Sequence, residues 1–355
     1  MKLCIFGLTI SSSWGNGHAT LWRGLVRALA RDGHEVVFFE RDAPYYARHR
    51  DMPSPPGCEL RLYREWQDVR AGAARAVAAA DVAMVTSYCP DARAATELVL
   101  DARAPVAAFY DLDSPVTLAR LDAGEEVDYL PPQGLAAFDL VLSYAGGGAL
   151  DRLRDQLGAR RAAPLYGSVD PDVHRPAAPD PRLVAHASYL GTYAADRQPS
   201  LERLLVEPSR RLPARRFLLA GSMYPGGCAW PENLHRLEHV PPGQHAAFYC
   251  SSRVTVSVTR AAMARCGHCP SGRLFEAAAC GVPVLSDRWP GLDEFFEPGR
   301  EIFVADTTEE AMEVLTSPRG ELERAGRAAR ARALEEHSAG RRARELVELV
   351  AAAAA

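Results

Sequence analysis

The sequence has almost no lysine. Lys2 is the only one, so arginine supplies nearly all of the 41 positive charges, against 45 acidic residues and a formal net charge of −4. This balance offers no overall basic field that would attract nucleic acid or an anionic membrane. We therefore expect no nucleic-acid partner. Arginines scattered on helix faces are expected to be solvated, whereas arginines in glycine-rich loops suggest phosphate contacts.

Long hydrophobic runs are also absent. Nowhere do 18 apolar residues follow one another, which is the length that a membrane-spanning helix needs. The chain begins directly on a strand-like segment, residues 2–8, without the charged leader and cleavage site of a secreted protein. We expect a cytoplasmic protein with no integral membrane segment.

The cysteines do not form a recognisable metal or redox framework. Cys266-Gly267-His268-Cys269 is the tetrapeptide used by disulfide isomerases, but it lies in the middle of the chain and no second Cys-x-x-Cys or histidine pair completes a zinc site. We favour a structural role over redox or metal chemistry and expect no metal. The other six cysteines lie mostly in apolar segments typical of reduced, buried thiols, at positions 4, 58, 89, 228, 250 and 280.

Residues 253–294 carry the clearest pattern. A β-branched strand at 253–258 is followed by a Gly/Ser/Pro loop at 267–272, a Leu/Ala/Glu-rich helix at 273–280 and an apolar strand at 282–285. Backbone amides at the start of such a helix suit a phosphate-sized anion. We assign this role to Ser271, Gly272, Arg273 and Leu274, with added charge from Arg260 and Arg273.

Glu276 falls about one turn into the same helix. Its carboxylate can reach what is attached to a diphosphate at the helix start, and a ribose diol is a natural partner for paired acceptor oxygens. The whole stretch therefore suits a nucleotide diphosphate.

The same residues carry a family resemblance. PSGRLFEAAACGVPVLSD resembles the donor-binding segment of GT-B glycosyltransferases of the family 4-like group, and residues 259–302 resemble the CgeB-type (spore-maturation-protein-like) glycosyltransferases. The resemblance implies an α/β protein of GT-B architecture, with two Rossmann-like parallel-sheet domains facing across a cleft. One departure is that His268 stands eight residues before Glu276, where the family usually has a second glutamate.

At 355 residues the chain exceeds the usual size of a single core, so we expect two domains. The expected N-terminal, acceptor-side domain spans 1–168, and a Pro- and Asp-rich linker spans 169–182. The donor domain follows at 183–336, and a C-terminal helix at 337–355 is expected to cross back to the first domain, as in GT-B folds.

Near the N-terminus, a strand is followed by a glycine loop and a helix, but the third glycine of a dinucleotide fingerprint is missing. By resemblance to GT-B enzymes, Gly15, Asn16 and Gly17 form the loop that lets the backbone approach the donor. His18 then borders the reaction centre. The alternative is that His18 only caps or packs at the helix start. Glu40, at the end of the second strand, is assigned to the acceptor side.

Asp111 and Asp113 follow the strand at 106–110. The carboxyl ends of parallel strands hold the site in open α/β sheets. We expect Asp111 to shape the acceptor side and Asp113 to orient the acceptor or take its proton. The alternative for both is an Asx turn ahead of Pro115.

The remaining donor-site assignments come from the second domain. By resemblance, Arg197 reaches the donor diphosphate, for which bidentate arginine is well suited. Tyr193, Ser222 and Thr259 follow strand ends and complete the expected donor site.

These assignments predict transfer of a sugar from a UDP-, dTDP- or GDP-sugar to an acceptor that the sequence does not identify, with no cofactor beyond the nucleotide sugar. The alternatives are a GT-B-shaped sugar-nucleotide epimerase or phosphorylase, and a non-catalytic protein that binds sugar nucleotides.

Overall fold

The computed structural model describes residues 1–102, 106–227 and 229–355, so Cys228 lies outside the described residues. The chain divides into two compact units. The first contains Met1–Tyr166 together with Ala339–Ala355, and the second contains Gly167–Ser338. No helix in the described ranges is both long and apolar enough to cross a membrane.

The first unit is built on a parallel sheet of seven strands in the order β3-β2-β1-β4-β5-β6-β7. Helices alternate with the strands along the chain, as expected of a parallel sheet. The elements are β1 (Lys2–Gly7), α1 (Gly17–Arg31), β2 (Glu35–Arg41), α2 (Pro44–Ala47), β3 (Glu59–Tyr63), α3 (Trp66–Ala78), β4 (Val82–Thr86), α4 (Ala92–Asp101), β5 (Val106–Asp111), α5 (Ser114–Asp122), β6 (Leu140–Ser143), α6 (Gly148–Leu157), β7 (Ala162–Pro164) and α15 (Ala339–Ala354).

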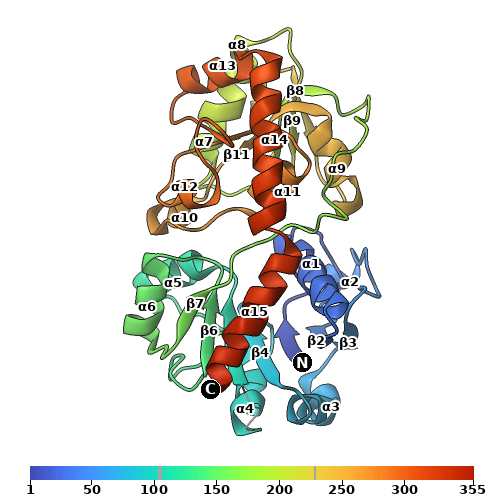
Figure 1. Cartoon of the computed structure of the whole chain (residues 1–355), viewed down its shortest axis with the longest axis vertical. Helices are drawn as coiled ribbons and strands as arrows, with labels where there is room; N and C mark the ends of the chain where they lie inside the picture. The colour runs from blue at the N-terminus through green and yellow to red at the C-terminus, as the bar shows by residue number, and fades with distance from the viewer. Residues whose placement is uncertain (103–105, 228) are drawn as a thin grey trace. The chain divides into compact units, whose positions relative to one another are not determined.

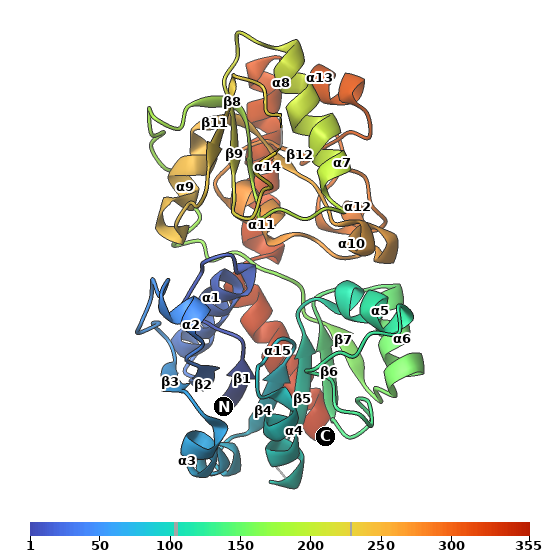
Figure 2. The same cartoon turned by 180° about the vertical axis from the view of Figure 1, so that it is seen from behind.

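Both faces of this sheet are covered. Along β1, Leu3 and Ile5 enter one hydrophobic cluster, whereas Cys4 and Phe6 enter another on the opposite face. This alternation follows from the two-residue period of a strand and explains why the strands read as continuous apolar runs. Figure 2 shows α4 on the second of these faces.

The C-terminal helix belongs to the first unit. α15 packs along α1 and over β5 and β6, as Figure 1 shows. Its buried Leu346 and Val350 share a cluster with Trp22 and Leu25 of α1. The C-terminal helix α15 and the N-terminal helix α1 therefore contribute to the same hydrophobic core.

The second unit is built on a parallel sheet of six strands in the order β10-β9-β8-β11-β12-β13. Its elements are β8 (Ala185–Leu190), α7 (Gln198–Leu201), a π-helical turn η1 (Glu202–Val206), α8 (Glu207–Arg211), β9 (Phe217–Ala220), β10 (Leu234–Leu237), α9 (Pro242–Cys250), β11 (Ser252–Ser257), α10 (Ala261–Cys266), α11 (Gly272–Ala279), β12 (Val284–Ser286), α12 (Leu292–Phe295), β13 (Phe303–Val304), α13 (Thr308–Thr316) and α14 (Arg319–Glu336).

The segment 169–182, expected to be a linker, lies within the second unit. The Ala177 N–H donates to the Cys250 sulfur at 3.3 Å, and the Asp180 N–H donates to Ser251 Oγ at 2.8 Å. These bonds hold the segment against the end of α9.

The central pattern of strand, helix and strand appears as β11, α11 and β12. α11 ends where the sequence indicates, because Gly281 adopts a left-handed φ of 75° and donates to the Ala278 carbonyl, while Val282 donates to Ala277. This is the Schellman arrangement that glycine favours. The loop before α11 lies at 267–271, as expected, and residues 261–266, to which no element had been assigned, form the additional helix α10. β3 is a further strand to which the sequence pattern had assigned no element.

Leu346→Ala tests whether α15 is part of the first core. Leu346 is fully buried, so removing its side chain should lower the free energy of unfolding by about 2–5 kcal/mol, measured by chemical denaturation. Glu348→Ala on the exposed face of the same helix is the matched control and should change it little. Equal effects of the two substitutions would contradict this packing.

Candidate functional site

The N-terminus of α11 presents backbone donors. Ser271 occupies the N-cap position with extended φ and ψ and makes no side-chain capping bond. The amides of Gly272 and Arg273 have no acceptor within the helix, as expected for a first turn. The Leu274 amide instead donates to the Ser271 carbonyl at 2.9 Å, and the Leu274 side chain is buried. Two of the predicted amides can therefore bind an anion.

Arg273 turns back beneath this helix end. Its Nε donates to the Leu190 carbonyl at the end of β8, and Nη1 donates to Ser257 Oγ at 3.3 Å at the end of β11. The guanidinium also lies 4.6 Å from the centre of the Tyr189 ring. Arg273 thus ties α11 to two strand ends, and its contribution to an anion is a fixed nearby charge.

The turns after β8 and β9 lie so close to each other and to Arg273 that positions 191 and 221 have no room for a side chain. A Cβ on Gly191 would lie 2.6 Å from Arg273 Nη2, and one on Gly221 would lie 2.0 Å from the Gly191 carbonyl oxygen. Gly221 also has a φ of 149°. These two glycines let the turns after β8 and β9 close around Arg273.

Two more arginines lie in the same region. Arg197 Nη2 donates to the Thr192 carbonyl at 2.7 Å, and Arg260 Nε lies 3.4 Å from Asp196 Oδ1. Burial and the neighbouring charges of Arg273 and Arg260 lower the pKa of Arg197. Mutual repulsion of this kind is relieved by a bound anion. A pocket of about 660 Å³ opens here, lined by Thr192, Tyr193, Ala194, Ala195, Asp196, Arg197 and Arg260.

Three further predicted donor residues support the loops around this pocket. The Tyr193 amide donates to the Ser222 carbonyl at 3.0 Å, which joins the turns after β8 and β9. Thr259 donates to Asp287 from its amide at 3.0 Å and from Oγ1 at 2.9 Å. Burial raises the pKa of Asp287 to about 6. Asp287 follows β12 and was not singled out by the sequence pattern.

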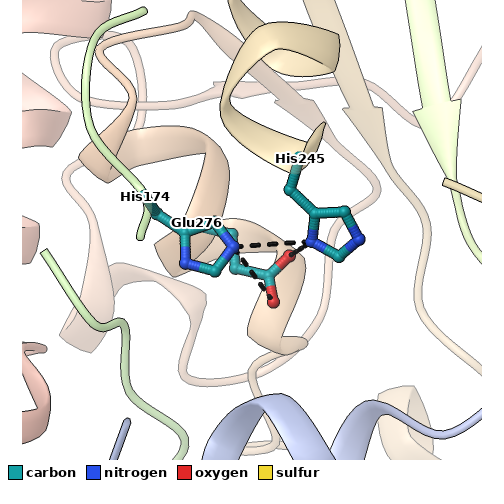
Figure 3. A group of neighbouring side chains, drawn as sticks. All are labelled: His174, His245 and Glu276. Atoms are coloured by element: carbon teal, nitrogen blue, oxygen red, sulfur yellow. Dashed lines mark hydrogen bonds and ion pairs between the residues drawn. The ribbon is translucent and has the colours of Figure 1, made fainter. Parts of the chain in front are cut away.

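Glu276 lies in a group of facing side chains, drawn in Figure 3. Tyr249 donates to Glu276 Oε2 at 2.9 Å. His174 Nε2 lies 3.9 Å from Glu276 Oε1, and His245 Nδ1 lies 3.7 Å from Glu276 Oε2. Sequence reasoning missed all three partners. They come from segments far from α11 in the sequence, so no local pattern could have joined them to it.

The Cys-Gly-His-Cys segment packs against the residues that follow β12, where the His268 amide donates to the Pro290 carbonyl at 2.8 Å. Both cysteines are reduced, and the Cys269 side chain is buried. Gly267 and His268 both have positive φ, and His268 Nε2 lies 3.0 Å from Glu294 Oε1. His268, which replaces the usual glutamate, is thus paired with a carboxylate.

The glycine loop of the first unit is fixed at the start of α1. Asn16 is the N-cap residue, and its side chain accepts from the His18 amide at 3.0 Å. Gly15 has a left-handed φ of 61°. Asn16 therefore caps α1, and of the alternative role for His18, capping is excluded and packing at the helix start is left.

Glu40 has a different role from the expected one. It is fully buried and its two carboxylate oxygens accept from Thr9 Oγ1 at 2.9 Å, the Ile10 amide at 2.8 Å and the Ser11 amide at 3.0 Å, with a further bond from Ser11 Oγ. Both oxygens are engaged within the protein. Glu40 therefore holds the loop that leads to Asn16.

His18 and Asp113 face each other. His18 Nε2 lies 3.6 Å from Asp113 Oδ2, and each side chain is about one-fifth exposed. Tyr88, which has a positive φ of 63°, lies with its ring 5.7 Å from that of His18. Burial and the charge of Asp113 raise the pKa of Tyr88. The first unit thus assembles an imidazole, a carboxylate and a phenol from α1, the end of β5 and the end of β4.

Asp111 is fully buried at the end of β5. Its Oδ1 accepts from the Asp113 amide at 3.0 Å, the Asx turn that was one alternative for this segment. Its Oδ2 is buried with no hydrogen-bond partner among the described residues. Burial raises the pKa of Asp111 to about 6.

The family comparison concerns the second half of the chain. Residues 197–348, somewhat under half of the sequence, match a family model described as Glycosyl transferase-like. The matched segment begins at Arg197 and includes α11 and Glu276. A comparison with curated proteins finds no match.

Solved structures resemble the whole chain. Sucrose-phosphate synthase (tll1590) from Thermosynechococcus elongatus superposes with a TM-score of 0.69 at 14% identity, covering 99% of this chain and 98% of that one. HepE (Alr3699) of Anabaena, solved with UDP-glucose, gives 0.65 at 14% identity over 99% and 100%. An alpha-glucosyltransferase solved with UDP and DNA gives 0.70 at 12% identity over 99% of each chain.

These likenesses define the fold. The chain has the fold of the GT-B glycosyltransferases, with two Rossmann-like domains each built on a parallel sheet, and this confirms the fold class expected from the sequence. Within that fold, residues 197–348 match the family model described as Glycosyl transferase-like.

The buried Asp111 predicts a pH-dependent stability. Its pKa rises from about 3.9 in the unfolded chain to about 6 in the structure. The neutral Asp111 side chain therefore makes its full contribution to the free energy of unfolding below pH ~4. This contribution is lost as the pH rises to ~6, by up to about 3 kcal/mol.

Asp111→Asn keeps a neutral side chain at every pH. The free energy of unfolding of the variant should equal that of the wild type near pH 4 and exceed it near pH 7, as measured by urea denaturation at both pH values. A difference that does not change between these pH values would show that Asp111 does not titrate as described.

Proposed function

We propose that this protein is a glycosyltransferase that moves a sugar from a nucleotide diphosphate sugar to an acceptor hydroxyl or similar nucleophile. The observation that carries the proposal is the gathering of Arg197, Arg260 and Arg273 beside the N-terminus of α11. The glycosyl transferase-like match of residues 197–348 supports it.

The second unit has the means to stabilise a leaving diphosphate. Negative charge grows on the diphosphate as the bond to the sugar breaks, and fixed donors and cations that are already in place lower the energy of that state. The amides of Gly272 and Arg273 would donate to the phosphate oxygens, while Arg197 and Arg260 would supply charge from the pocket.

Glu276 would bind the ribose of the donor. Glu276 lies one turn inside α11, so its carboxylate would lie beyond a diphosphate bound at the helix start. Tyr249 fixes the carboxylate through its hydrogen bond to Oε2. A held carboxylate can accept from two neighbouring hydroxyls.

The first unit would supply the base for the acceptor. His18 Nε2 would take the hydroxyl proton as the new bond forms, and the neighbouring Asp113 carboxylate would stabilise the positive charge that the ring gains. The 3.6 Å separation of the two groups in the free protein can tighten when substrate binds.

The donor is proposed to be a UDP-, dTDP- or GDP-sugar. The HepE structures contain UDP or UDP-glucose, which makes uridine nucleotides the first to test. The resemblance of residues 259–302 to CgeB-type enzymes supports placing this protein in that group of the family 4-like transferases, with the nucleotide sugar as co-substrate and no other cofactor.

The first experiment is turnover. The purified protein should release nucleoside diphosphate from one of these donors faster when an acceptor is present. Hydrolysis or isomerisation of the donor at the same rate without any acceptor would favour an epimerase or phosphorylase instead. Binding of an intact donor with every acceptor tried would favour a non-catalytic protein.

Arg197→Ala and Arg260→Ala should weaken UDP binding more than uridine binding. Hydrogen bonds to charged groups contribute about 1.5–3 kcal/mol, which corresponds to about 10- to 100-fold in the dissociation constant for UDP. Isothermal titration calorimetry with both ligands measures this. Arg265→Ala, an exposed arginine on α10, is the charge-matched control and should bind both ligands like the wild type. Equal losses for UDP and uridine would contradict the assignment.

His18→Ala should lower kcat by about 100-fold or more, because a positioned general base contributes about 10²–10⁴. The affinity of the His18→Ala variant for the donor should equal that of the wild type. Asp113→Asn should lower kcat to a smaller extent and leave KM for the donor unchanged. Initial-rate kinetics with a fixed acceptor measures both, and a variant that alters only donor affinity would argue against a base at this place.

A further inference from the structure

We propose that His174, His245 and Glu276 form a binding site for a zinc-class divalent transition-metal ion within the second unit. The residues come from three separate segments: the loop that precedes β8, helix α9 and helix α11. Their facing atoms are His174 Nε2, His245 Nδ1 and the Glu276 carboxylate, as Figure 3 shows.

The spacing of these atoms fits an ion better than it fits hydrogen bonds. The two nitrogens lie 3.5 Å apart, His174 Nε2 lies 3.9 Å from Glu276 Oε1, and His245 Nδ1 lies 3.7 Å from Glu276 Oε2. Hydrogen bonds of this kind have separations of about 2.7–3.2 Å. Ligand atoms on a tetrahedral zinc ion with bonds of about 2.0–2.1 Å lie about 3.4 Å from one another.

The kind of donor atom indicates the class of metal. Two imidazoles and one carboxylate are a donor set of zinc sites that keep a fourth position open. Magnesium and calcium prefer oxygen ligands alone.

The surroundings orient the ligands. His245 Nε2 lies 3.0 Å from the Val240 carbonyl, to which it donates its proton, so Nδ1 keeps its lone pair toward the site. Tyr249 holds the carboxylate through Glu276 Oε2. The side chains of His174, His245 and Glu276 are only 1%, 12% and 14% exposed. The side chains of His245 and Glu276 are therefore held in place before an ion binds.

Backbone hydrogen bonds hold the loop that carries His174. The His174 amide donates to the Asp170 carbonyl at 2.9 Å, and the bonds from Ala177 and Asp180 to the end of α9 keep this loop beside His245. Glu276 also carries the proposed ribose contact, so the metal site and the donor site share one residue and need separate tests.

The test is titration of the full chain, freed of metal with EDTA, with Zn²⁺ by calorimetry and with Co²⁺ by visible absorption. No nucleotide is present. We expect one ion per chain and the intense d–d bands of tetrahedral Co²⁺. UDP binding is measured separately in EDTA, so that failure of the proposed transferase site and failure of the metal site can be told apart.

His174→Ala and His245→Ala should each weaken Zn²⁺ binding by more than about 100-fold, since loss of an outer-shell partner alone costs about 10–100-fold. Glu276→Gln, which keeps the shape of the side chain, should also weaken it and covers the case in which an alanine variant fails to fold. His235→Ala, an exposed histidine on β10, should bind like the wild type.

Three results would overturn the proposal. The first is Zn²⁺ affinity that is equal in the wild type and all three ligand variants. The second is a weak octahedral Co²⁺ spectrum. The third is a near-ultraviolet thiolate charge-transfer band that persists in the variants, which would place the ion on cysteines instead.

Discussion

The candidate donor site depends on one side chain, Arg273. Its guanidinium donates to the Leu190 carbonyl and to Ser257 Oγ while it stacks on Tyr189, so it joins α11 to the carboxyl ends of β8 and β11. Gly191 and Gly221 lack side chains where any Cβ would meet this arrangement. The N-terminus of α11 is thereby fixed beside the turns that carry Arg197 and Arg260. A buried cation held by hydrogen bonds from Nε and Nη1 also raises the local positive potential without having to move when an anion binds.

A comparable chain of contacts supports the first unit. Buried Glu40 accepts four hydrogen bonds from Thr9, Ile10 and Ser11, and this loop leads to Asn16, which caps α1 and sets the position of His18. In each unit one ionisable side chain at the carboxyl end of a parallel sheet, Arg273 or Glu40, fixes the backbone through hydrogen bonds. Other residues are then available to contact the substrate. This division of roles is consistent with the placement of sites at strand ends in open α/β sheets.

Local features of the fold could be read from the sequence, and contacts between distant segments could not. β11, α11 and β12 follow from β-branched and Ala-rich runs with Gly281 and Pro283 as stop signals. Glu40 and Arg273 were recognised as notable, but their hydrogen bonds with backbone carbonyls and amides depend on how loops close, which no periodicity encodes. Tyr249, His174 and His245 meet Glu276 only because the loop before β8, α9 and α11 come together in three dimensions. Asp287 and Tyr88 gave no signal beyond their positions after strands.

The central claim is that the start of α11, with Arg197 and Arg260, holds the diphosphate of a nucleotide. A crystal structure of the protein with UDP tests it most directly. The account predicts that the phosphates accept from the amides of Gly272 and Arg273 and lie within hydrogen-bond distance of Arg197, with the ribose against Glu276. Density for UDP at any other place, with the start of α11 bare or filled by protein side chains, would contradict it.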